Sequence, residues 1–526
     1  MLKFTAVKSY WLPILSGIFI GTSYIPFPPW AALFGFVPLW IFWQRQTELK
    51  SVIFGGMTTA FVFTLIGFNW MTYLLHEFAN LPWTLAVVGM ILYALFAHTF
   101  VAIAGAVWFL IKRKFVCSPA LSLGLLAIIT ILNEAYSFTL FDWNFGYSWF
   151  GAGIPFYQLA ELVGFSGLSA ITLAFNLPFY LAWQWRTEKR GKVILISVVG
   201  VFTLLNVSGL ALKARLPKND AEFNVLMVQG NVGSMEKMAA ETGDGYGQVI
   251  LNRYLSLTHD ALEKHKDQKI DFVFWAETAF PTFLGENLTP QNDYPRQLQE
   301  FLQEHNVPLV TGAYSVKFPE RLLTNSLFLL NENGEILPPH YSKTILLAFG
   351  EYIPFEEFFP QIRNWLPPIG HFARGDGATT LFNLNGLKMA PQICYEGLFA
   401  YFSRDLANLG ADIMVNVTND SWYGTWQQPY QHFYMTLARG VEFRRPVLRV
   451  TNTGISSVSL ASGEILQRSP IHEMWADVYR VPYLKNPPPT FYQQWFYLLP
   501  ILLWLSFFSL IILAWRNRKH SIPPMY

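Results

Sequence analysis

Cys394 is the residue of this chain that is best placed to act as a nucleophile. It ends a strand-like segment, residues 389–393 (MAPQI), and Tyr395 and Glu396 follow it before a helix-compatible sequence. A nucleophile at a strand-to-helix turn is held rigidly and lies beside backbone N–H groups that can stabilise an oxyanion. A thiol of ordinary pKa is mostly protonated at pH 7, so this chemistry also needs a base or a neighbouring cation.

Two other strand ends supply those groups. Glu277 ends the apolar segment 270–277 (IDFVFWAE), where partial desolvation would raise the pKa of its carboxyl group toward that of a general base. Lys343 follows the strand-like end of a hairpin predicted over residues 327–342, where Asn333-Gly334 is the turn signal. Glu277 and Lys343 are therefore the candidate base and the candidate cation for Cys394.

The composition indicates a membrane protein. Of the 526 residues, 52% are apolar, 17% are aromatic and 14% are charged, against about 25% charged residues in a typical soluble domain. Basic and acidic residues number 37 and 35, so the net charge is only +2, and no long basic run occurs. This balance excludes a disordered chain and a nucleic-acid-binding protein.

Long apolar stretches fill the N-terminal part of the chain and recur near its C-terminus. A helix of about 20 apolar residues crosses a hydrocarbon core of about 30 Å. We expect about eight transmembrane helices, near residues 10–25, 29–44, 53–75, 83–111, 119–141, 166–184, 193–211 and 491–515. Basic residues follow every second stretch, whereas the loops near 76–82 and 142–165 contain no Lys or Arg. The positive-inside rule therefore places both termini in the cytoplasm.

The chain between the seventh and eighth predicted helices differs in kind, because it holds most of the acidic residues and alternates strand-like with helix-like patterns. We expect an α/β domain there, on the outer side of the membrane. The predicted domains are residues 1–218 with seven transmembrane helices, residues 219–488 with the outside domain, and residues 489–526 with the eighth helix and a short cytoplasmic tail.

The two cysteines cannot form a disulfide, because Cys117 and Cys394 are predicted to lie on opposite sides of the membrane. An unpaired thiol is most often a buried, inert side chain, and we interpret Cys117 in this way. The strand-end context of Cys394 and its two candidate partners favour a reactive thiol instead.

No metal site and no cofactor is predicted. The ten histidines have no metal-ligand spacing, and the sequence contains no HExxH motif. It also lacks the GxSxG, Walker and GxGxxG motifs, which argues against a serine hydrolase, an ATPase and a dinucleotide enzyme.

Five short motifs resemble one enzyme superfamily. Residues 275–278 (WAET), 341–343 (YSK) and 394–396 (CYE) are similar to the Glu–Lys–Cys signature of the nitrilase, or carbon–nitrogen hydrolase, superfamily. Such a domain before the last membrane helix further resembles the bacterial apolipoprotein N-acyltransferase family, as do residues 350–355 (GEYIPF) and 416–422 (NVTNDSW). The resemblance covers essentially the whole chain. It implies an αββα sandwich on the periplasmic face of a bacterial inner membrane.

The resemblance also implies a ping-pong acyl transfer. Glu277 would accept the proton of Cys394, and the thiolate would attack an ester of a membrane phospholipid to form a thioester. Lys343 and the backbone N–H of Tyr395 would stabilise the oxyanion. The N-terminal amine of an S-diacylglyceryl apolipoprotein would then take the acyl chain. The expected partners are therefore a phospholipid, an apolipoprotein and the bilayer, and the expected state is a monomer.

The same resemblance implies supporting residues around these three. Glu351 and Glu396 would orient Lys343 and the site, and Trp422 would line it. Residues 352–372 are rich in Phe, Trp and Pro, and such a loop could enter the membrane interface or pack on its own domain.

Two other functions compete with acyl transfer. A membrane-tethered amidase would send the same thioester to water, so a requirement for an amine acceptor separates the two enzymes. A transporter or receptor would use the outside domain only to bind a ligand. The predicted membrane helices lack paired charged residues along a pathway, and a binding protein has no need for Glu277, Lys343 and Cys394 together.

Overall fold

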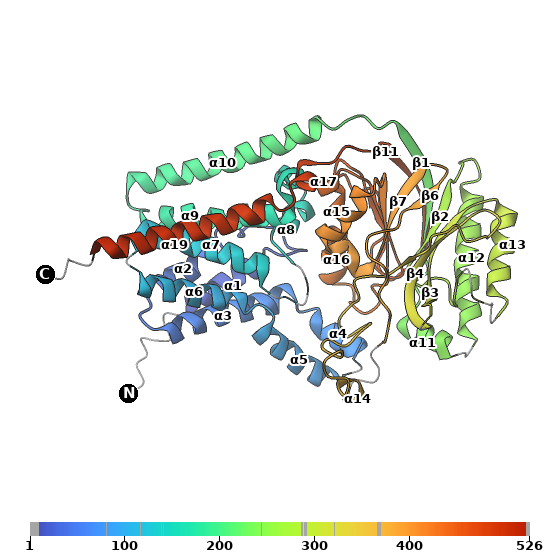
Figure 1. The fold of residues 1–526 in the computed structure, drawn as a ribbon, viewed down its shortest axis with the longest axis horizontal. Coiled ribbons are helices and arrows are strands. Elements are labelled where there is room, and N and C mark those ends of the chain that lie inside the picture. The colour runs from blue at the N-terminus through green and yellow to red at the C-terminus, as the bar shows by residue number, and fades with distance from the viewer. Residues whose placement is uncertain are drawn as a thin grey trace. The chain divides into compact units, whose positions relative to one another are not determined.

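The structure is a computed structural model that describes residues 10–521, apart from residues 80, 116, 138, 140, 142, 243–244, 286–287, 289–291, 320 and 366–369. The chain forms two compact units (Figure 1). One, called here the helical unit, is drawn from residues 1–215 and 491–526, and the other, called the α/β unit, from residues 216–490.

The helical unit contains six helices that are long and apolar enough to cross a membrane, among the described residues. They span Leu49–Gly67, Trp83–Lys114, Pro119–Tyr136, Pro155–Gln184, Lys189–Ala214 and Leu498–Asn517. The helices of this unit are α1 (Trp11–Gly21), α2 (Val37–Gln44), α3 (Leu49–Gly67), α4 (Met71–Glu77), α5 (Trp83–Phe96), α6 (Phe100–Lys114), α7 (Pro119–Tyr136), α8 (Gly146–Gly151), η2 (Pro155–Leu159), α9 (Ala160–Gln184), α10 (Lys189–Ala214), α18 (Phe491–Gln494) and α19 (Leu498–Ser521).

The membrane-bundle class is confirmed, but the two first predicted crossings differ from the expectation. They correspond to α1 and α2, which have 11 and 8 residues. At 1.5 Å per residue these helices are roughly 17 and 12 Å long, short of a core of about 30 Å. Turns occupy most of residues 22–36 between them, where Pro26, Pro28 and Pro29 disfavour a continuous helix.

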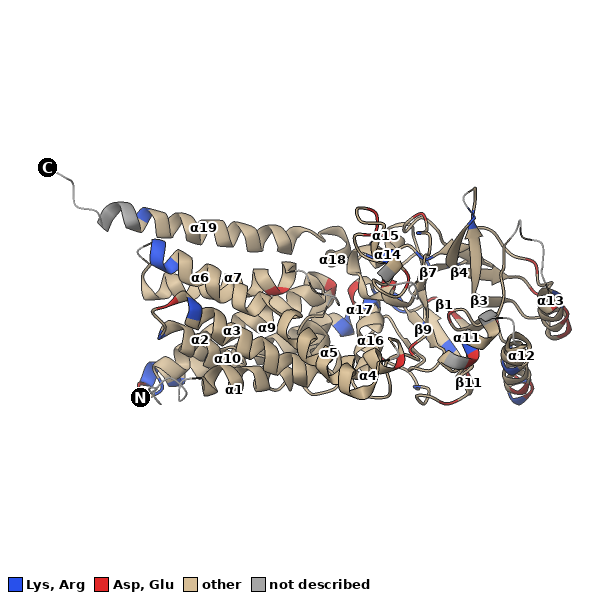
Figure 2. Cartoon of the chain, turned by 90° about the horizontal axis from the view of Figure 1, so that it is seen from below, with Lys and Arg blue, Asp and Glu red and all other residues tan. Residues whose placement is uncertain are grey.

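The helical unit exposes apolar side chains, as expected for a surface that faces lipid. Helix α10 exposes Ile196, Val199 and Leu204, with 61–71% of each side chain accessible. In Figure 2 Lys and Arg residues gather at the ends of the helices where α6 finishes and α10 begins, whereas Lys213 lies in the last turn of α10. Apolar flanks with basic residues at one end are typical of helices that cross a bilayer.

The α/β unit is an αββα sandwich. Its two sheets have the strand orders β11-β1-β2-β3-β4-β5 and β10-β9-β8-β7-β6. Helices α12 and α13 cover the outer face of the first sheet, and α15 and α16 cover the second (Figure 1). The strands are β1 (Ala221–Gln229), β2 (Phe272–Trp275), β3 (Leu309–Lys317), β4 (Leu322–Leu330), β5 (Tyr341–Ser342), β6 (Phe382–Leu384), β7 (Leu387–Ile393), β8 (Ile413–Thr418), β9 (Val447–Thr451), β10 (Ser457–Ser459) and β11 (Trp475–Tyr483). The helices are α11 (Ser234–Thr242), α12 (Tyr246–Lys264), α13 (Tyr294–His305), α14 (Ile362–Trp365), η3 (Cys394–Leu398), α15 (Ala400–Asn408), α16 (Gln428–Leu437) and α17 (Arg439–Phe443).

Parallel pairing at the centre of each sheet explains the uninterrupted apolar runs of the sequence. Strand β2 lies parallel to β1 and β3, and β8 lies parallel to β7 and β9. Every residue of β2 and β8 is buried, as expected for strands covered on both faces. The first and last strands of the unit, β1 and β11, pair antiparallel along their whole length.

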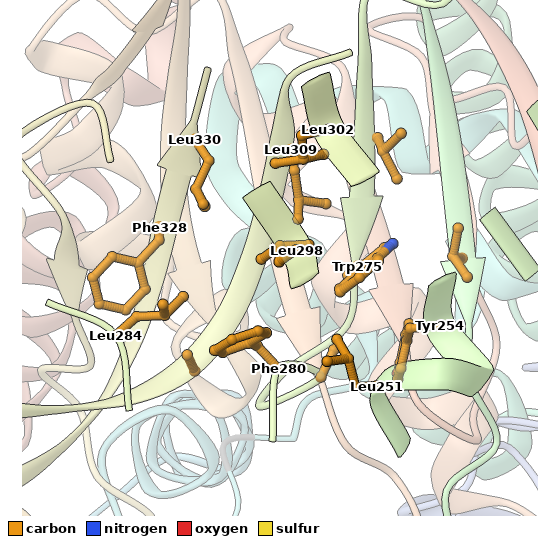
Figure 3. Close-up of a cluster of buried hydrophobic side chains, with 14 of the residues drawn as sticks. Leu251, Tyr254, Trp275, Phe280, Leu284, Leu298, Leu302, Leu309, Phe328 and Leu330 are labelled. Carbon is orange, nitrogen blue, oxygen red and sulfur yellow. The ribbon is translucent and has the colours of Figure 1, made fainter. Parts of the chain in front are cut away.

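A buried cluster fixes α12 and α13 to the six-stranded sheet (Figure 3). Trp275 of β2 packs with Tyr254 of α12, and Leu298 and Leu302 of α13 join the same cluster. Burying one such side chain contributes about 1.5–3 kcal/mol. This packing holds β2 rigid, and with it the residues at its carboxyl end.

Candidate active site

The three residues predicted to do chemistry all follow strand ends of the α/β unit. Glu277 lies two residues after β2, Lys343 directly follows β5, and Cys394 directly follows β7. Lys343 and Glu277 approach each other to 3.9 Å between Nζ and Oε1, and the charges of both residues act on the Cys394 thiol. Exposed fractions of 7%, 2% and 8% show that Glu277, Lys343 and Cys394 are all buried. The structure therefore brings the three predicted residues into one site.

Glu351 is the closest partner of Lys343. The Lys343 Nζ lies 2.9 Å from Oε1 and 2.8 Å from Oε2 of Glu351. The backbone N–H of Leu347 donates to the same carboxylate at 2.9 Å. Asn325 of β4 then joins the two carboxylates, because its Nδ2 donates to Glu277 at 2.7 Å and to Glu351 at 3.2 Å.

Burial and charge set the protonation of these groups. Burial raises the pKa of the Glu277 carboxyl group, while Lys343 acts in the opposite direction. Burial would lower the pKa of Lys343, but the negative charges of Glu351, Cys394 and Glu277 raise it above its usual value. Burial also raises the pKa of the Cys394 thiol to about 12. The resting site therefore holds a protonated thiol beside a carboxylate of raised basicity and a permanent cation.

Cys394 has the backbone geometry of a strained turn. Its φ is +53°, in the left-handed region that non-glycine residues rarely adopt. The residue begins the 3₁₀ turn η3, and Asn416 of β8 donates from Nδ2 to its carbonyl oxygen at 3.2 Å. Strain of this kind persists only where the surroundings over-determine the conformation, and it is frequent at reactive positions.

Glu396 joins the two sheets at the site. Its fully buried carboxylate accepts hydrogen bonds from Tyr341 Oη and the Thr344 backbone N–H, both at 2.6 Å, and from the Ile345 N–H at 3.0 Å. It also accepts from the Ile393 N–H, next to the nucleophile, at 2.8 Å. Burial raises the pKa of Glu396 to about 7, although these hydrogen bonds favour its charged form. Glu396 thus fixes the segments that carry Lys343 and Cys394.

A buried polar network that contacts Cys394 through Asn416 was not predicted from the sequence. Arg449 of β9 donates to Asp420 at 2.8 Å and to Asn416 at 3.1 Å. His432 of α16 contacts the other Asp420 oxygen at 2.9 Å. Burial would raise the pKa of Asp420, but Arg449 and His432 hold it below the usual value. The sequence did hold one indication of this network, because the polar residues Asn416 and Arg449 lie within the otherwise apolar strands β8 and β9.

Tyr395 and Trp422 lie next to these groups in the chain, and both are half-buried. Tyr395 follows the nucleophile within η3, where its ring packs against Phe399 with centroids 4.9 Å apart. Trp422 lies in the loop between β8 and α16, two residues after Asp420. The oxyanion role of the Tyr395 N–H and the lining role of Trp422 stay predictions.

A cavity of about 600 Å³ opens beside Glu277. Aromatic side chains form much of its wall, and its lining includes Lys237, Glu277, Thr278, Phe280, Tyr314 and Phe372. Part of the predicted apolar loop is exposed as well. Phe355, Phe358 and Phe359 have 64–76% of their surface accessible, whereas residues 366–369 of that loop lie outside the described residues.

This arrangement suits covalent acyl transfer. A thiol, a carboxylate base and a fixed ammonium are the groups that a thioester mechanism requires. Among the residues that the structure describes, no group of three or more His, Cys, Asp or Glu could hold a metal ion.

Comparison with known proteins identifies the family. Residues 16–178 match the apolipoprotein N-acyltransferase N-terminal domain, and residues 226–479 match the carbon-nitrogen hydrolase family. The apolipoprotein N-acyltransferase of Bdellovibrio bacteriovorus is 41% identical over 492 residues, which cover 92% of this chain and 89% of the relative. The chain belongs to the apolipoprotein N-acyltransferase family.

One more distant relative is similar over nearly the same length, and one solved structure is similar over about half of the chain. The apolipoprotein N-acyltransferase of Geobacter metallireducens is 28% identical over 89% of this chain and 88% of its own. An amidase from Nesterenkonia sp. of known structure is 17% identical, with a TM-score of 0.35, over 55% of this chain and 98% of that chain. The nitrilase-like fold and the family resemblance predicted from the sequence are confirmed.

Proposed function

We propose that this protein transfers a fatty acyl chain from a membrane phospholipid to the N-terminal amine of an S-diacylglyceryl apolipoprotein. Membership of the apolipoprotein N-acyltransferase family supports the reaction. The observation that carries the mechanism is the convergence of Glu277, Lys343 and Cys394 at buried strand ends of one unit.

The first half-reaction loads the enzyme. Glu277 takes the proton from Cys394 as the sulfur attacks the ester carbonyl, which is required because burial keeps the resting thiol protonated, with a pKa of about 12. Lys343 and the backbone N–H of Tyr395 stabilise the tetrahedral oxyanion. The C–O bond then breaks, Glu277 returns the proton to the departing lysophospholipid, and a thioester remains on Cys394.

The second half-reaction discharges the thioester. The α-amine of the apolipoprotein attacks the thioester carbonyl, and Glu277 accepts a proton from the amine. The C–S bond breaks, an amide forms, and Cys394 recovers its proton from Glu277. A thioester intermediate suits an amine acceptor, since direct aminolysis of an ester is slow. In both half-reactions Glu351 and Glu396 position Lys343, and Trp422 lines the site.

The proposed location follows from the helices and the charges of the sequence. The helical unit would lie in the inner membrane of a bacterium with both termini in the cytoplasm, and the α/β unit would face the periplasm as part of a monomer. Basic residues at one end of the helices support this orientation.

The test is a mass spectrum of the chain purified with bacterial phospholipid, compared with the Cys394→Ala variant. Cys117→Ala is the matched control, because this half-buried thiol has no role in the reaction. We expect a hydroxylamine-labile acyl adduct on the wild type and on Cys117→Ala, discharged by a diacylglyceryl-cysteine peptide with amide formation. An adduct that buffer discharges equally fast would favour the amidase, and the absence of any adduct would refute Cys394 as the nucleophile.

A further inference from the structure

The proposed reaction places more negative than positive charge around Lys343. Glu277 and Glu351 are both carboxylates, and Cys394 becomes negative when it is deprotonated. The Lys343 Nζ lies 2.8 Å from Glu351 but 3.9 Å from Glu277, so its charge is engaged mainly by Glu351. Like charges in a buried site favour the protonated form of a carboxyl group. A base at this position therefore needs a second source of positive charge.

Lys237 of α11 contacts the turn that carries Glu277, and its charge acts on the Glu277 carboxylate. Its Nζ donates a hydrogen bond to Oγ1 of Thr278, the residue that follows Glu277. Thr278 has a φ of +46°, and its hydroxyl donates to the Glu277 carbonyl oxygen at 2.8 Å. Lys237, Thr278 and Glu277 all line the cavity of about 600 Å³. The ammonium is thus attached to the turn that carries the base.

Polar contacts fix helix α11 to two neighbouring segments, helix α12 and the loop after β8. Glu236 forms a two-pronged ion pair with Arg253 of α12, with N···O distances of 2.9 and 3.0 Å. Ser234 hydrogen-bonds Ser421, in the loop after β8, at 3.0 Å between the two hydroxyl oxygens. Lys237 is therefore presented by an anchored helix and not by a free surface side chain.

The charged and titratable groups that act on Glu277 and Cys394 come from several elements. They are Lys237, Lys343, Glu351, Asp420, Tyr423 and Arg449. Among those acting on Glu277, Lys343 and Lys237 oppose the effect of burial, which raises the pKa of the carboxyl group. Arg253, on the helix that anchors α11, is paired with Glu236.

We propose that Lys237 is a positioning residue that keeps Glu277 ionised, so that Glu277 can act as the base of the reaction. This role rests on the proposed function, in which Glu277 takes the proton from Cys394. Its consequence is that Cys394 is deprotonated more readily with Lys237 than without it.

The experiment measures the rate of Cys394 alkylation by iodoacetamide against pH, in the full-length detergent-solubilised chain carrying Cys117→Ser. This assay needs no acyl donor, so it reads the charge balance even if no acyl transfer occurs. Lys237→Met and Lys237→Gln remove the ammonium, and Lys237→Arg keeps the charge. Arg253→Met is the matched control, since it removes one positive charge from the anchor of α11. Thermal unfolding of each variant checks that the chain is folded.

We expect both neutral variants to move the alkylation profile upward by about one pH unit, which is about a tenfold slower reaction at pH 7. Lys237→Arg should retain the wild-type profile, and so should Arg253→Met. An unchanged profile in the two neutral variants would overturn the proposal. An equal shift in Arg253→Met would also overturn it, because the effect would then come from the placement of α11. If the neutral Lys237 variants lose the acyl adduct but keep the wild-type alkylation profile, Lys237 has only a substrate-binding role, which contradicts the proposal.

Discussion

The two sheets of the α/β unit contribute different kinds of polar group to the site. We call the two sets the carboxylate half, which is Glu277, Asn325, Lys343 and Glu351, and the arginine half, which is Asn416, Asp420 and Arg449 and supports the nucleophile Cys394. In the carboxylate half, burial raises the pKa of Glu277 toward the range in which it exchanges protons. In the arginine half, Arg449 and His432 keep the pKa of Asp420 low despite its burial.

This difference separates proton transfer from structural support. In the carboxylate half, Glu277 changes charge during the proposed reaction, and it lines the cavity of about 600 Å³. The Asp420–Arg449 pair is wholly buried and stays charged while it holds Asn416 against the Cys394 carbonyl. Substitutions in the first half should therefore change rates, and substitutions in the second should change stability.

The largest effect is expected for Glu277→Gln. Removing a general base costs about 10²–10⁴-fold in rate, and the amide of Gln keeps the volume of the side chain. We expect acyl-enzyme formation to slow by that factor in a single-turnover assay, while the unfolding temperature stays near that of the wild type. If Glu277→Gln also lowered the unfolding temperature strongly, the carboxylate half would affect stability as well as rate, and the two halves would not differ in this respect.

Arg449→Met tests the arginine half. Breaking a buried ion pair on one side costs about 3–5 kcal/mol, because the Asp420 carboxylate is left buried without its partner. The control is Arg480→Met, which breaks the exposed Arg480–Glu222 pair and should cost less than about 1 kcal/mol. Chemical unfolding of both variants measures the two values, and equal losses would contradict the assignment.

Glu396 links the halves and should make their joint stability pH-dependent. Burial raises its pKa to about 7 in the folded state, above the ordinary value of 4.5. Between these values the folded state binds more protons than the unfolded state, so stability falls as pH rises from 4.5 to 7. The change is at most roughly 3 kcal/mol at 1.36 kcal/mol per pKa unit. Glu396→Gln should flatten this part of the curve of unfolding free energy against pH, and an unaltered slope would assign it to another group.

Asn325→Ala is expected to have the smallest effect. It removes hydrogen bonds to the charged forms of Glu277 and Glu351, so the pKa of Glu277 rises and less base is ionised at a given pH. The rate of acyl-enzyme formation should fall about tenfold at pH 7, for a loss of about 1.4 kcal/mol. The acidic limb of the pH–rate profile should also move upward. Asn333→Ala, in an exposed turn of the same unit, should change neither.

Much of this site was predictable because the end of a buried strand is visible in the sequence as the end of an apolar run. The apolar runs of β2 and β7 stop at Glu277 and Cys394, and the hairpin turn at Gly334, with a φ of +76°, is where Asn-Gly predicts it. Asn325 was not predictable, since it lies within an apolar strand and the sequence does not say which carboxylates it faces. Arg449 and Asp420 meet only through the pairing of β8 with β9, which no local pattern specifies.

The helical unit shows a second limit of sequence patterns. Apolar composition located α1 and α2 but overstated their lengths, because hydropathy averages over the prolines that end a helix. The roles of Glu277, Lys343 and Cys394 remain predictions that the experiments above test, whereas their placement in one site follows from the sheets.

The pairing of β1 with β11 bears on the order in which the protein is made. Residues 221–229 leave the ribosome about 250 residues before residues 475–483, their partners in the six-stranded sheet. At about 5–20 residues per second, β1 waits tens of seconds with one edge unpaired. The strand that completes the sheet is followed at once by α18 and α19. The six-stranded sheet is therefore completed only when α18 and α19 are about to be made, so the closing of this sheet and the appearance of the membrane helix α19 are coupled in time.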